Sequence, residues 1–168
     1  MTEPVTPLPP AKAFGEDERS VLIGYLAFYR TVLARKVEGV ADADARRPAC
    51  LPSRITLLGL IRHMTDVERW WFRRVHGAED IGGLFDDDEE WNVSPEATVS
   101  EALATYWDEI SLIDAHLARA GMDDLNAGGP EPGQHALRRM IVHMIEEYAR
   151  HCGHADLVRE SIDGSTGD

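Results

Sequence analysis

Residues 137–158 read LRRMIVHMIEEYARHCGHADLV, and their apolar side chains recur at the three- and four-residue spacing of a helix. The apolar positions are Leu137, Met140, Ile141, Met144, Tyr148 and Val158. They form a broad stripe, and Glu147 and His151 lie on its flank. We predict one long helix from about Gln134 to Ile162, with this stripe turned toward a core.

The same periodicity predicts three more helices upstream. They span about Glu16 to Val40, Thr56 to His76 and Thr98 to Ala120. Thr98 and Glu101 match a capping box at the start of the last of these. Four long helices and no segment with strand periodicity predict an all-α four-helix bundle. About twenty residues separate the second helix from the third, which is long enough for a crossover between the two halves of the bundle.

The segments outside the helices divide the chain into an arm, one domain and a tail. Residues 1–15 contain four prolines and are predicted to form an extended N-terminal arm. Residues 16–163 form the single bundle domain, and residues 164–168 are expected to be a frayed tail. A link rich in helix breakers joins the first two helices. The acidic run Asp86–Glu90 lacks the glycine and alternating donors of a calcium loop, so we interpret it as solvated.

Composition excludes several classes of protein. The chain has 168 residues, 43% of them hydrophobic, which suits one globular domain. A net charge of −13 would repel phosphate backbones, so nucleic acid is not an expected partner. No apolar run reaches the roughly 18 residues of a membrane span, and no secretory signal opens the chain. Cys50 and Cys152 form no redox motif, and Cys152 is expected to be a buried structural thiol. These features predict a cytoplasmic protein.

Three side chains are candidate metal ligands. Glu147 and His151 are four residues apart, so on a helix they lie about 5–6 Å from each other and could grip one divalent ion. A third ligand must come from another helix, and His63 is the obvious donor. Trp70 and Trp71, on the same helix as His63, could wall a pocket beside it.

Alternatives stay open for each of these histidines. Glu147 and His151 could be an exposed surface pair worth a few tenths of a kcal/mol. His143 lies about 12 Å along the axis from His151, so it could replace His151 but not join it. His154 is better placed behind the ligands or in a pocket wall than on the metal. Surface histidines without a role are expected at three further positions, His76, His116 and His135.

Two segments carry a resemblance to a known family. They are residues 60–71, LIRHMTDVERWW, and residues 147–157, EYARHCGHADL. Over nearly the whole chain the sequence resembles the DinB/YfiT-like metalloenzyme superfamily. The resemblance implies an up-down-down-up bundle with a long crossover between helices two and three. It also implies one divalent metal per chain, zinc or else nickel, on His63, Glu147 and His151, and a homodimer.

The chain departs from that superfamily at Glu147, where most members carry histidine. A glutamate there resembles the branch of mycothiol-dependent maleylpyruvate isomerases. Two histidines and one glutamate leave coordination positions open, where zinc lowers the pKa of a thiol or water. The resemblance therefore implies transfer of a low-molecular-weight thiol such as mycothiol to a small electrophilic substrate, or a thiol-assisted isomerisation. Two alternatives are a metal-dependent hydrolase of small molecules and a non-enzymatic metal-binding bundle of the stress response.

Overall fold

The computed structural model describes residues 15–85 and 91–166, and this part of the chain is helical. The helices are α1 (Glu18–Arg35), α2 (Asp42–Ala45), α3 (Leu57–Glu68), the π-helix η2 (Arg69–His76), α4 (Val99–Leu117) and α5 (Leu137–Asp163). One isolated antiparallel bridge joins Leu125 to Ala136. The predicted all-α bundle is confirmed, with α1, α3, α4 and α5 as its four long helices.

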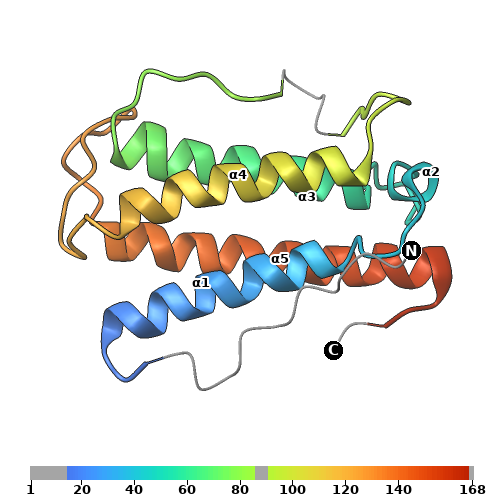
Figure 1. Cartoon of the computed structure of the whole chain (residues 1–168), viewed down its shortest axis with the longest axis horizontal. Coiled ribbons are helices and arrows are strands. Elements are labelled where there is room, and N and C mark those ends of the chain that lie inside the picture. The colour runs from blue at the N-terminus through green and yellow to red at the C-terminus, as the bar shows by residue number, and fades with distance from the viewer. Residues whose placement is uncertain (1–14, 86–90, 167–168) are drawn as a thin grey trace.

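The four long helices form two packed pairs, α1 with α5 and α3 with α4 (Figure 1). Along the colour gradient of Figure 1, α1 and α5 run from left to right, whereas α3 and α4 run from right to left. The order is therefore up, down, down, up, as the family resemblance implied. Because α3 and α4 are parallel neighbours, the chain must return along the bundle between them, and the crossover after η2 does so.

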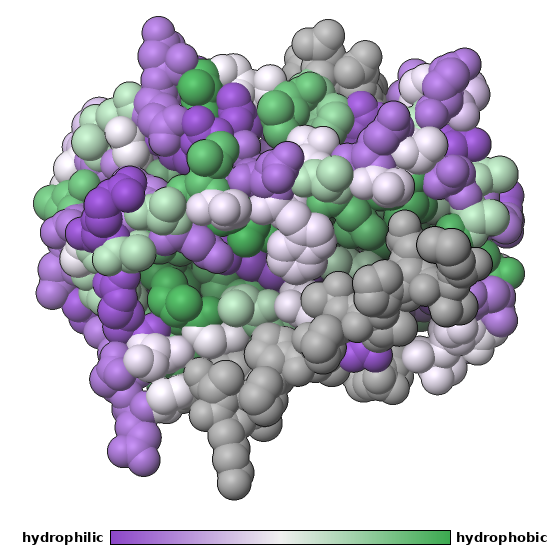
Figure 2. Space-filling view, in the orientation of Figure 1, coloured by the Kyte–Doolittle hydropathy of each residue, from purple (hydrophilic) through white to green (hydrophobic). Residues whose placement is uncertain are grey.

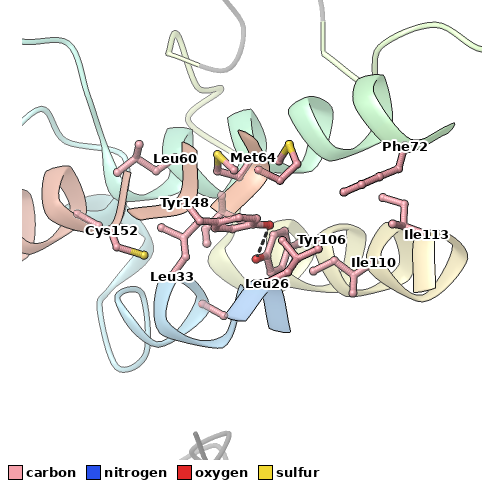
Figure 3. Close-up of a cluster of buried hydrophobic side chains, with 14 of the residues drawn as sticks. Leu26, Leu33, Leu60, Met64, Phe72, Tyr106, Ile110, Ile113, Tyr148 and Cys152 are labelled. Carbon is pink, nitrogen blue, oxygen red and sulfur yellow. Dashed lines mark hydrogen bonds between the residues drawn. The ribbon is translucent and has the colours of Figure 1, made fainter. Parts of the chain in front are cut away.

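Polar caps fix where the helices begin, and apolar faces hold them together. Asp17, Thr56 and Thr98 each accept a hydrogen bond from a backbone N–H in the first turn of the helix that follows. At Thr98 the predicted capping box with Glu101 is present. The core contains the predicted stripe of α5 packed against the inner faces of the other helices (Figure 3). Hydrophilic and apolar residues are interspersed over the face drawn in Figure 2.

Some predicted boundaries differ from the structure. The first helix ends at Arg35, five residues earlier than expected, and the link after it contains the short helix α2. The second helix is α-helical only to Glu68 and continues as the π-helix η2. The last begins at Leu137 and ends before Gly164, whose φ of 79° is the left-handed cap that glycine favours. The predicted arm, apart from Gly15, and the acidic run Asp86–Glu90 lie outside the described residues.

The expectation that His76 lies at the surface is wrong. His76 ends η2 and is only 7% exposed, because the loop before α5 packs over it. Ala127 donates a backbone hydrogen bond to the carbonyl of His76, and Gly128 donates one to that of Val75. A side chain at Gly128 would place its Cβ 2.4 Å from the carbonyl oxygen of Arg74, so glycine permits this close approach.

Cys152 is buried, as predicted, and burial raises the pKa of its thiol to about 12. The thiol is therefore protonated near neutral pH and is not a nucleophile. None of the helices in the described part of the chain is both long and apolar enough to cross a membrane.

Candidate metal centre and adjoining cavity

The bundle brings His63 of α3 beside His151 of α5. Their rings are 4.8 Å apart between centroids, nearly perpendicular to each other. Glu147, one turn before His151, places Oε2 3.5 Å from Nε2 of that histidine. The side chains of His151 and Glu147 are only 10% and 14% exposed, which does not fit an exposed surface pair. All three sequence-predicted ligands thus lie in one region between α3 and α5.

Burial keeps His151 neutral. Loss of water around the ring, followed by the nearby rings of His63 and His154, lowers the pKa of His151 to about 4. The neutral imidazole is the form that binds metals. His154 lies one turn further along α5, with Nδ1 3.3 Å from Nδ1 of His151.

Glu147 has two other polar neighbours. Nη1 of Arg150 lies 3.2 Å from Oε1 of Glu147, and Nε2 of His143 lies 3.9 Å from the same oxygen. Three side chains of α5, namely those of His143, Arg150 and His151, thus lie near the carboxylate of Glu147. As the side chains stand, residues 15–85 and 91–166 contain no group of three or more His, Cys, Asp or Glu that could hold a metal ion. His63, Glu147 and His151 are neighbours, but an ion would require their side chains to turn toward one point.

A cavity of about 320 Å³ adjoins His63. Trp70 and Trp71 are among the residues that line it. Ile81, Gly82 and Gly83, from the start of the crossover, line its other side. His143 does not line this cavity. Its ring is 4.8 Å from that of Trp71, and it lines a smaller cavity with Arg139.

Two features of this region were not predicted. Trp91, at the far end of the crossover, has its ring centroid 5.3 Å from that of His63. The π-helix η2 places Arg69 and Arg73 against Glu109 of α4, with N–O distances of 2.9 Å for both. π-helical turns are common at functional sites. Neither feature has a signal in hydrophobic periodicity, because one lies in a loop and the other depends on packing between helices.

A buried polar network lies in the core, where the sequence predicted only apolar contacts for its tyrosines. Arg30 of α1 donates from Nε to Oε1 of Glu68 at 2.6 Å, and both residues are almost fully buried. The hydroxyl of Tyr148 donates to Glu68, and Tyr106 is hydrogen-bonded to Tyr148 at 2.9 Å (Figure 3). The sequence feature that could have predicted this network is Glu68, which lies on the inner face of α3. A buried carboxylate there needs a partner.

No curated protein matches this chain. Residues 21–164 match the family described as mycothiol-S-transferase, and the match runs from the first turn of α1 to the end of α5. It agrees with the resemblance to the mycothiol-related branch that the segments around His63 and His151 carry. This chain therefore belongs to the mycothiol-S-transferase family.

Proposed function

We propose that this protein is a divalent-metal-dependent enzyme that transfers mycothiol, or a similar low-molecular-weight thiol, to a small electrophile. The observation that carries the proposal is that His63, which lines a cavity, lies beside His151, and that His151 lies beside Glu147, in a member of this family. Two imidazoles and one carboxylate suit zinc or nickel and leave open positions for a thiol.

The donor set fits a metal in its chemistry. His151 is neutral near pH 7, and Nε2 of its ring faces a carboxylate oxygen of Glu147. If Nδ1 of His151 donates to Nδ1 of His154, Nε2 of His151 carries the lone pair, and His151, Glu147 and His63 would be the residues that hold the cation. A bound zinc or nickel ion would supply one chemical effect, which is to lower the pKa of the thiol.

The chain's own residues would hold and orient the reactants. His154 would fix the tautomer and orientation of the His151 ring through Nδ1. The tryptophan-walled cavity beside His63 would receive the electrophile and exclude water from part of its surface. In the transfer, the thiol proton passes to water and the sulfur electron pair forms the new carbon–sulfur bond. When the electrophile is a halide, the halide ion leaves with the electrons of its bond.

Metal-dependent thiol conjugation tests this function directly. Protein purified without an affinity tag would be incubated with mycothiol and a model aryl halide, and the product mass would be measured. We expect conjugation that stops with a chelator and returns with zinc or nickel. A product that carries water instead of thiol would identify a hydrolase. Lack of acceleration with mycothiol and with other bacterial thiols, for metal-loaded protein, would refute the transferase.

We also propose a homodimer in the cytoplasm. The free thiols of Cys50 and Cys152 support a reducing compartment. Apolar side chains that are more than half exposed on the outer faces of α4 and α5 support self-association, namely Leu112, Val142 and Leu157. Light scattering coupled to size-exclusion chromatography would measure the mass in solution, and a monomer at micromolar concentration would refute the dimer.

A further inference from the structure

The cavity beside His63 combines flat apolar walls with one exposed cation. Val67 and Ile81 contribute aliphatic surface, and the indole rings of Trp70 and Trp71 contribute aromatic surface. Trp70 is 39% exposed although it is a large apolar side chain. Aromatic walls that remain open to solvent favour the binding of a planar apolar group.

Arg74 places a positive charge at this cavity. Its guanidinium lies 4.5 Å from the centre of the Trp70 ring. Stacking on an aromatic ring holds a guanidinium in place and leaves its N–H edge available for a carboxylate. No carboxylate of the described residues is ion-paired with Arg74, which distinguishes it from Arg69, the cavity's other arginine, whose partner is Glu109.

Asp66 is the only carboxylate among the described residues that lines the cavity, and it already has partners. Its two oxygens accept hydrogen bonds from the backbone N–H groups of Leu84 and Phe85, at 2.8 and 3.1 Å. These bonds also hold the start of the crossover, including Gly83, over the cavity. The chain's net charge of −13 repels anions at a distance, so an anion would be held here only by a local cation. Arg74 is that cation.

We propose that this cavity selects electrophiles that combine a planar apolar body with a carboxylate. The body would stack on Trp70, and the carboxylate would pair with the guanidinium of Arg74. The reacting carbon would then lie on the His63 side of the cavity, where the thiol sulfur forms its bond and the leaving group departs as an anion. This inference rests on the proposed function, of which it names the substrate class.

Binding can be tested separately from turnover. Dinitrobenzoate and dinitrobenzamide have the same planar ring, carry no leaving group and quench indole fluorescence on contact. Tryptophan fluorescence of the purified metal-loaded protein would be titrated with each. We expect saturable quenching by both and tighter binding of the carboxylate. In Arg74→Gln the affinity for dinitrobenzoate should fall about fivefold, the order expected for an exposed charge pair, while that for the amide should not change.

Two further variants provide controls. Arg47→Gln removes the same charge from an exposed arginine that does not line the cavity, and it should bind both probes as the wild type does. Trp70→Leu should weaken both probes, because it removes the stacking surface, and it should weaken the carboxylate at least as much as the amide, because Arg74 loses the ring that holds its guanidinium. Equal affinity of the wild type for the two probes, or equal effects of the Arg74 and Arg47 changes, would overturn the proposal.

Turnover measurements distinguish a failure of the proposed substrate class from a failure of the proposed transferase function. With mycothiol, chlorodinitrobenzoate should have a lower KM than chlorodinitrobenzamide in the wild type, and Arg74→Gln should remove this difference with little change in kcat. Selective binding without turnover of either halide would support the cavity assignment and count against the transferase. Turnover of both halides without preference for the carboxylate would support the transferase and count against the cavity assignment.

Discussion

Nδ1 of His151 lies 3.3 Å from Nδ1 of His154, so one of the two imidazoles donates a hydrogen bond and the other accepts it. The other nitrogen of the His151 ring, Nε2, lies 3.5 Å from Oε2 of Glu147. Two consecutive turns of α5 thus provide a candidate ligand pair and a neighbour that could orient one of its rings. His63 of α3 reaches the same place from another helix.

Metal content tests this arrangement. Elemental analysis of untagged protein should find close to one zinc or nickel per chain. His151→Ala should lose the metal, because it removes the ligand that lies between His63 and Glu147. His154→Ala should retain it with an affinity about 10- to 100-fold weaker, as expected for a group that orients a ligand.

His135→Ala is the matched control for metal content, since His135 lies before the start of α5, where it is paired with Glu131. It should bind metal as the wild type does. Full metal retention in His151→Ala would show that the ligand assignment is wrong.

Glu68 is expected to be the most sensitive charged residue of the core. Glu68→Gln would leave Arg30 charged and buried without its buried carboxylate partner, and it should lower the free energy of unfolding by about 3–5 kcal/mol. Asp114→Asn is the control, because Asp114 pairs with the same arginine but is 56% exposed, and it should cost less than about 1 kcal/mol. Urea unfolding would measure both.

Tyr148→Phe gives a milder test of the same network. It removes the hydroxyl between Glu68 and Tyr106, and it should lower the free energy of unfolding by about 1–2 kcal/mol.

If Glu68→Gln and Asp114→Asn were equally stable, the network would not contribute as its burial indicates.

Glu109 should stabilise η2. It is 5% exposed and accepts hydrogen bonds from both Arg69 and Arg73. Glu109→Gln should lower the free energy of unfolding by about 1–3 kcal/mol, because Arg69 loses its charged partner and Arg73 keeps only Glu79. Glu146→Gln, at a site 66% exposed on α5, should have little effect in the same urea titration. Similar losses in the two variants would contradict this role.

Acid should weaken the contact between the ends of η2 and α4. Nδ1 of His76 lies 2.7 Å from Nε2 of His116, and burial lowers the pKa of both rings below the ordinary value of 6.5. The unfolded chain therefore binds more protons than the folded protein as the pH falls below that value. The free energy of unfolding should decrease on acidification from about pH 7 to pH 5.

Variants separate this contribution from other titrating groups. His116→Asn should make the decrease shallower, because it removes one of the two rings that must stay neutral. His135→Asn should leave the slope as in the wild type. An unchanged slope in His116→Asn would show that this pair does not control the acid sensitivity.

The sequence by itself determined the helices and their inner faces. Periodicity located the four long helices, and Thr98 with Glu101 marked the start of α4. Spacing along one helix also placed Glu147 beside His151, since helical geometry fixes which residues share a face. These features are local, so a single stretch of chain contains all the information that they need.

Only the tertiary structure decided which residues of different helices meet. It placed the ring of His63 against that of His151, paired Arg30 with Glu68 and buried His76 under the loop before α5. It also turned the second half of the predicted second helix into η2, which brings Arg69 and Arg73 to Glu109. Such pairings depend on the register and rotation of packed helices, which the periodicity of one helix does not specify.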